Sequence, residues 1–67
     1  MKHIVATFDK NKKCLYREDF PTAEMAYEAY TDYIRVLRAR LEKGEEVTVV
    51  RFNDGYVMTM ETIVGTH

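Results

Sequence analysis

The feature that most restricts the fold of this chain is one long amphipathic segment in its middle. Thr22 is a good helix N-cap, Pro21 before it disfavours extension backwards, and Gly44 can take the left-handed conformation that ends a helix. We therefore expect a single helix from about Ala23 to Lys43. Its apolar side should contain the residues that recur at helical spacing, namely Ala26, Tyr30, Tyr33, Leu37 and Leu41, flanked by Ala29, Ile34 and Val36.

Segments of alternating apolar and polar residues lie on both sides of this helix and predict two β-hairpins. The first hairpin occupies residues 2–18. One loop length would pair Phe8 with Cys14, and a loop one residue shorter would pair Ala6 with Leu15. The sequence leaves these two registers open, and a slip of one residue would move every side chain to the other face.

The second hairpin is predicted over residues 45–64. Its Asn-Asp-Gly turn at residues 53–55 suits a type I turn with Gly55 in the left-handed position. This three-residue loop would pair Phe52 with Tyr56. The resulting order is ββαββ, which predicts an α+β fold: an antiparallel sheet with one long helix packed on one face.

A single helix covers only one face of a sheet, so the other face needs its own explanation. We expect the helix to pack on the face of Phe52, Tyr56, Met58 and Met60, because these side chains are larger. The opposite face would then be open, and we interpret it as a protein-binding interface. Its candidate residues are Val5, Val47, Val49, Arg51, Val57 and Ile63, with Tyr27 at the margin of the helix as a further anchor. The alternative is an ordinary solvated face, since β-branched residues are favoured in strands anyway.

Composition excludes several classes of protein. Charged residues make up 31% of the chain and nearly cancel to a net charge of -1, which argues against a strongly basic nucleic-acid binder. No apolar run approaches the roughly 20 residues of a membrane span, and the N-terminal sequence lacks the apolar region of a signal peptide. A single cysteine excludes a disulfide within the chain. We expect a cytoplasmic protein without a membrane segment, forming one domain over residues 1–67 and stabilised by oligomerisation.

Residues with catalytic or metal-binding potential are few. The soft or imidazole ligands are His3, Cys14 and His67, whose spacing is not that of a metal site, and the terminal His67 is expected to be mobile. Cys14 would need a positioned base to act as a nucleophile, and His3 is the sole candidate. An acidic ladder on the helix face away from the core, typical of a solvated surface, contains Glu24, Glu28 and Asp32. We therefore predict no enzyme activity, no cofactor and no metal.

Two basic clusters support an alternative function, weak binding to nucleic acid. Lys10, Lys12 and Lys13 lie in the turn of the first hairpin, where Asn11 is the residue expected to be left-handed. Arg35 and Arg38 lie on the second half of the helix. If the two clusters met in space, they could contact phosphates.

The absence of a catalytic pattern and the surplus of apolar residues favour a small non-catalytic protein-binding module. We expect an inhibitor or adaptor of a larger protein, with a homodimer through the open sheet face as one form of partner. In length and self-contained fold the chain is similar to small phage and prophage accessory proteins, many of which inhibit a host protein by binding it. No motif is shared with them, so this similarity assigns no residue a role.

Overall fold

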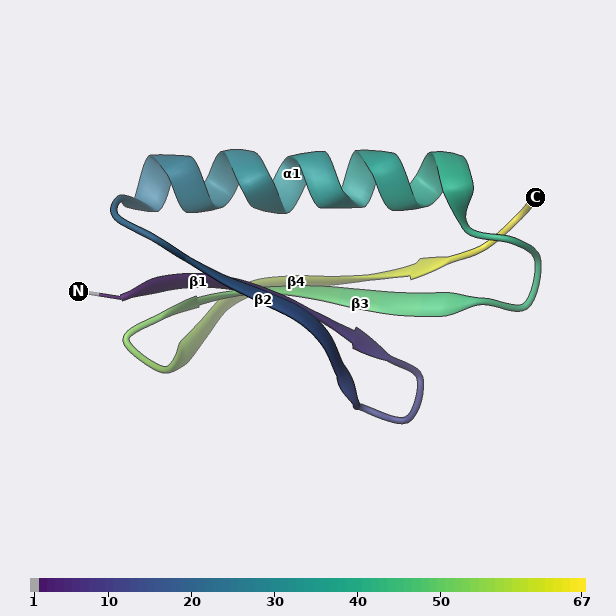
Figure 1. The fold of residues 1–67 in the computed structure, drawn as a ribbon, viewed down its shortest axis with the longest axis horizontal. Helices are drawn as coiled ribbons and strands as arrows, with labels where there is room; N and C mark the ends of the chain where they lie inside the picture. The colour runs from purple at the N-terminus through teal and green to yellow at the C-terminus, as the bar shows by residue number, and fades with distance from the viewer. Residues whose placement is uncertain (1) are drawn as a thin grey trace.

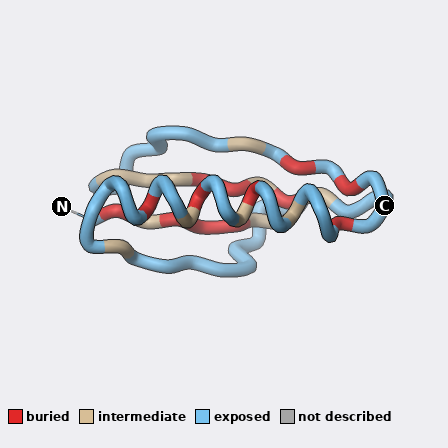
Figure 2. The backbone as a smooth tube through the Cα atoms, turned by 90° about the horizontal axis from the view of Figure 1, so that it is seen from above, coloured by how far each residue is buried: buried red, intermediate tan, exposed pale blue. Residues whose placement is uncertain are grey.

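The computed structural model describes residues 2–67 and has the predicted α+β architecture. The elements are β1 (His3–Asp9), β2 (Cys14–Phe20), α1 (Ala23–Arg40), β3 (Glu46–Asn53) and β4 (Tyr56–Val64). The strands form one antiparallel sheet in the order β2-β1-β3-β4. The helix lies along one face of this sheet, above the two central strands (Figures 1 and 2). The predicted ββαββ order is therefore confirmed.

The helix begins where the sequence predicts it to begin. The Thr22 side chain accepts a hydrogen bond from the backbone N–H of Met25 at 3.2 Å, which caps the first turn. The other end differs, because α1 stops at Arg40 instead of Lys43. Leu41 takes an extended conformation and its side chain turns into the core, where it is 8% exposed.

The C-terminal residues close the end of α1. The backbone N–H of Lys43 donates to the carbonyl of His67 at 2.8 Å. The ring nitrogen Nε2 of His67 lies 3.1 Å from the carbonyl oxygen of Arg38, one of the acceptors that a helix end leaves free. His67, expected from the sequence to be mobile, is therefore bound to the helix end.

The helix covers the opposite face of the sheet from the one predicted. With the exception of Val57, the strand residues proposed as the open face lie on the helix side, and the core contains Val5, Val47, Val49 and Ile63 together with Ala26, Tyr30, Ile34 and Leu41. Val5 and Val49 are 0% exposed, whereas Met60 is 60% exposed. The prediction by side-chain size is wrong because α1 itself supplies the large groups. Compact β-branched residues on the sheet let the helix approach closely enough to bury Tyr30 and Ile34.

The first hairpin contains a β-bulge. Phe8 lies opposite Cys14, as one of the two predicted registers has it, but Thr7 then lies opposite Tyr16. Leu15 is thus an extra residue in β2, and the pairing beyond it fits neither predicted register. The bulge places Tyr16 on the helix side of the sheet, where its ring packs edge-on against Tyr33.

The turn of the first hairpin is organised by Asp9. Its carboxylate accepts hydrogen bonds from the backbone N–H groups of Asn11 at 2.8 Å and Lys13 at 2.9 Å. These two bonds hold the chain so that Lys12, with a φ of 66°, takes the left-handed conformation. The prediction that Asn11 would do so is wrong.

The second hairpin has a shorter loop than predicted. Asn53 lies opposite Tyr56, so Asp54 and Gly55 alone form the loop, with φ values of 51° and 86°. Two positive φ values define the tight hairpin turn whose twist matches that of the strands. Gly55 is left-handed as predicted, but the three-residue loop is wrong. The pairing of Val50 with Met58 that the three-residue loop implies is also wrong, because Val50 lies opposite Met60. Beyond an extra residue at Met58, the residues of β4 nevertheless lie on their predicted faces, so only Tyr56 and Val57 exchange faces.

Candidate protein-binding surface

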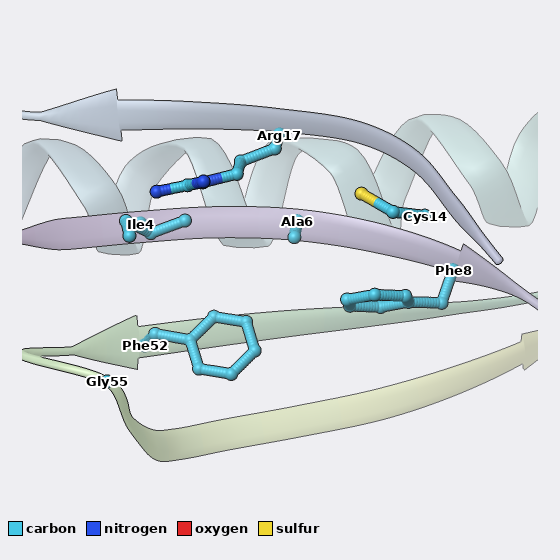
Figure 3. Close-up of a pocket in the computed structure, with 7 residues that line it drawn as sticks. All are labelled: Ile4, Ala6, Phe8, Cys14, Arg17, Phe52 and Gly55. Carbon is cyan, nitrogen blue, oxygen red and sulfur yellow. The ribbon is translucent and has the colours of Figure 1, made fainter. Parts of the chain in front are cut away.

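The face of the sheet away from α1 carries an apolar groove. Its floor is Ala6 on β1, which is 2% exposed, and the cross-strand partner of Ala6 on β3, Val50, is also buried, at 5%. The rings of Phe8 and Phe52 extend toward one another on either side of Ala6 (Figure 3). The groove has a volume of about 280 Å³ and is lined by Ile4, Ala6, Phe8, Cys14, Arg17, Phe52 and Gly55.

The twist of the sheet shapes this groove. The β1–β2 turn and the β3–β4 turn both bend away from α1 (Figure 1). Phe8 lies toward the first of these turns and Phe52 toward the second, so each aromatic ring stands where the sheet curves outward. The result is a hollow with aromatic walls and a floor of small side chains, a shape that accepts an apolar side chain from a partner.

Exposed apolar side chains concentrate on β4, next to the groove. Among residues 2–67, ten large apolar side chains are exposed, and five of them belong to this one strand: Tyr56, Val57, Met58, Met60 and Val64. Val57, Met60 and Val64 lie opposite Phe52, Val50 and Glu46 of β3, which places them on the face of the groove. We call the groove, together with the exposed residues Val57, Met58, Met60 and Val64 of β4, the open surface.

The two edges of the sheet differ in charge. The edge strand β2 carries Arg17, Glu18 and Asp19, whereas the single charged residue of β4 is Glu61. Glu61 forms an ion pair with Arg38 of the helix. Charges on an edge strand discourage pairing with another strand, so β2 is protected in this way and β4 is not.

Most of the strand residues predicted to bind a partner are buried in the structure, and only one of them lies on the open surface. Val5, Val47, Val49 and Ile63 are buried beneath α1 and have no contact surface to offer. Of that set only Val57, 53% exposed, belongs to the open surface. The residues missed from the sequence are the groove residues, above all Phe8 and Phe52.

Arg51 and Tyr27 form a separate cluster beside the helix. The guanidinium carbon of Arg51 lies 5.4 Å from the centre of the Tyr27 ring, a cation–π contact. Tyr27 is 52% exposed and also stacks on Tyr30, with the ring centres 6.4 Å apart. Within residues 2–67, the buried atoms Nε of Arg51 and Oδ1 of Asn53 have no hydrogen-bond partner. The contact with Arg51 accounts for the position of Tyr27 without a partner protein.

The chain matches no protein-family model, no curated protein and no solved structure. Its function is therefore inferred from the open surface and the chemistry of its side chains.

The structure does not bring the two basic clusters together. Arg35 pairs with Asp32 at 2.7 Å, and Arg38 pairs with Glu61, so both arginines face carboxylates. The lysines lie in the β1–β2 turn, which bends away from the helix that carries the arginines (Figure 1). A continuous basic surface for phosphates is not formed by these five residues.

His3 and Cys14 are also separated. His3 is 9% exposed and lies opposite Phe20, at the far end of the hairpin from Cys14. Cys14 is exposed at the rim of the groove. Residues 2–67 contain no group of three or more His, Cys, Asp and Glu side chains placed to hold a metal ion. In the same range, no helix has both the length and the apolar character needed to cross a membrane.

A tyrosine pair ties the edge strand β2 to the helix. The hydroxyls of Tyr16 and Tyr33 both donate to the same Glu18 oxygen, at 2.8 and 3.2 Å. Burial raises the pKa of the Tyr33 hydroxyl far above its usual range, and the neighbouring Tyr16 and Glu18 add to the increase.

The acidic ladder of the helix is exposed, as predicted, at Glu24, Glu28 and Asp32.

Proposed function

We propose that this chain is a small protein-binding module that contacts its partner through the open surface and acts as an inhibitor or adaptor of a larger protein. The observation that carries the proposal is the concentration of exposed apolar side chains on β4 beside the aromatic groove. A contiguous apolar surface of this kind is typical of protein interaction sites.

Burial of the exposed β4 side chains would contribute to the free energy of binding. Covering a half-exposed Val or Met side chain contributes on the order of 1 kcal/mol. Val57, Met58, Met60 and Val64 are each at least 50% exposed, so a partner that covers them gains a useful part of a binding free energy. Phe8 and Phe52 are already partly shielded and shape the pocket for an inserted side chain.

Charge at the rim sets the orientation of such a partner. Arg17 extends toward Ile4 at the side of the groove (Figure 3) and lies 3.6 Å from Asp19 in an exposed ion pair. Exposed pairs of this type contribute little to stability. Both groups are therefore free to exchange partners and to hydrogen-bond polar groups around an apolar anchor.

The alternative of nucleic-acid binding has less support. Arg35 and Arg38 each face a carboxylate, and the chain has a net charge of -1. The lysine turn alone would give weak, strongly salt-dependent binding.

An exposed thiol at Cys14 suits action in a reducing cytoplasm.

The experiment that tests the proposal is capture of partners from a lysate of the native cell, with and without nuclease. Three forms would be compared: the unmodified chain, Met60→Lys on the open surface, and Val36→Lys on the helix. Val36 is a matched control because it is also an exposed apolar residue, at 41%. We expect one stoichiometric protein, resistant to nuclease, that is retained by Val36→Lys and lost by Met60→Lys. Equal retention by both variants, or recovery of nuclease-sensitive material alone, would overturn the proposal.

A further inference from the structure

We propose that a second copy of this chain pairs with the free edge of β4, so that two sheets join across a two-fold axis into one eight-stranded sheet. The inference rests on the proposed function, since it assigns an occupant to the outer edge of the open surface. The dimer contact differs from the partner contact of the proposed function, because it is made by the backbone of β4 and not by the groove.

The free edge of β4 is the first observation. In residues 2–67 no strand pairs with its outer side, so a row of backbone N–H and C=O groups faces outward there. The helix lies above β1 and β3 and leaves this edge accessible (Figure 2). The opposite edge, β2, carries Arg17, Glu18 and Asp19, which disfavour the same kind of pairing.

The exposed side chains identify the register. A strand that pairs with its own copy in the antiparallel sense does so about a two-fold axis. The bulge at Met58 interrupts a regular ladder, which leaves residues Thr59 to Val64 for pairing. If the axis passes through Thr62, Met60 of one copy lies opposite Val64 of the other, and the reverse pair forms as well.

This register brings together two exposed apolar side chains of the strand. Met60 and Val64 are 60% and 59% exposed, and both lie on the face of the groove. The two Thr62 side chains would meet at the centre. An axis through Glu61 would instead place two carboxylates opposite each other, which is unfavourable. An axis through Met60 would bring the bulged Met58 into the ladder.

The arrangement has a functional consequence. A two-fold axis perpendicular to the sheet places both helices on one side and both grooves on the other. The open surface of a single chain would then become one continuous surface twice as wide. The pairing itself involves only a short segment of one strand. The surface area buried between the two copies is therefore smaller than the roughly 1,200 Å² at the lower end of standard interfaces. We therefore expect a dimer that dissociates on dilution.

Disulfide trapping in the purified chain tests the pairing. Residues directly opposite on antiparallel strands have Cα atoms about 4.5–5.5 Å apart, within the range that a disulfide spans. In a Cys14→Ser background, single cysteines would replace Thr59, Met60, Glu61 and Thr62 in turn. We expect Thr62→Cys to give a covalent dimer in high yield under mild oxidation. The unmodified chain, whose Cys14 lies on β2, is the matched control and should stay monomeric in the same gel.

Sedimentation equilibrium over a series of concentrations supplies the second readout. The unmodified chain and Val36→Lys should shift from monomer toward dimer as concentration rises, and Val64→Lys should remain monomeric. Monomers at every concentration with no trapped dimer at any of the four positions would overturn the pairing. Trapping through Cys14, or best trapping at Met60 or Glu61, would overturn the assigned edge or register. Loss of this dimer with retained partner capture would remove this inference alone and leave the proposed function standing.

Discussion

Gly65 lies directly against the backbone of Glu42: a methyl group on Gly65 would be 1.8 Å from the Glu42 carbonyl oxygen. The backbone N–H of Gly65 also donates to the carbonyl of Glu45 at 2.8 Å. The C-terminal residues thus run along the loop that follows α1 and hold it. The need for glycine here is one of space, whereas Gly44 and Gly55 are needed for their positive φ values.

The first prediction is that Gly65→Ala lowers the free energy of unfolding by about 2–3 kcal/mol, because the methyl group must push the Glu42 backbone away. Gly44→Ala is the control, since nothing lies within 4 Å of an added methyl group there and only its φ of +94° opposes the change. We expect about 1 kcal/mol for that variant. Urea unfolding of both variants measures the difference, and equal losses would contradict the close approach at Gly65.

A second prediction concerns the turn of the first hairpin. Lys12→Gly should raise the free energy of unfolding by about 0.5–1 kcal/mol, because glycine takes the left-handed conformation at Lys12 without strain. Asn11→Gly should lower it slightly, since there is no strain to relieve and the unfolded chain gains freedom. The same urea titration tests both. Stabilisation by Asn11→Gly instead would show that the turn is one residue out of place.

The pH dependence of stability should carry the signature of Tyr33. Burial raises the pKa of its hydroxyl in the folded chain, so the folded state keeps a proton that the unfolded state releases above about pH 10. The stabilising contribution of the neutral hydroxyl is complete below that pH and is lost as the pH rises further. Melting temperatures from pH 8 to 11.5 should therefore fall more steeply for the unmodified chain than for Tyr33→Phe. Parallel curves would refute the assignment.

The assignment of sheet faces is tested by two lysine substitutions. Val49→Lys should leave the chain unfolded, because a lysine at a 0% exposed core position costs several kcal/mol and a domain of this size has about that much stability. Val57→Lys should fold normally, with a change within about 0.5 kcal/mol, since its side chain is 53% exposed. Far-ultraviolet circular dichroism distinguishes the two. The reverse outcome would place the helix on the other face.

Local signals were enough to predict the elements. Thr22 identifies the start of the helix, and alternation identifies the strands, because capping and strand periodicity depend on neighbouring residues. The end of the helix was predicted too late, at Lys43. Leu41 leaves the helix to reach the core, and the C-terminal residues that bind the helix end are distant in sequence.

The sequence alone does not determine which face of the sheet the helix covers. In β3, Val47 and Val49 alternate with Val50 and Phe52, so either face could have been the core. Size favoured Phe52, but the large side chains of the core come from Tyr30 and Ile34 of the helix. Arg51 lies on the covered face, and a charged residue in the sequence favours a solvent-exposed face, so it also favoured the wrong assignment. Its contact with Tyr27, which makes that position tolerable, is a tertiary one.

The most direct test of the central claim, that the open surface binds a partner protein, is methionine footprinting. Met25 on the helix and Met58 and Met60 on β4 are 48%, 50% and 60% exposed, so dilute purified protein should oxidise at all three with similar rates. The chain would then be treated with peroxide in a lysate of the native cell and analysed by mass spectrometry. We expect several-fold protection of Met58 and Met60, with Met25 still reactive. Protection of Met25 instead, or equal oxidation of all three, would contradict it.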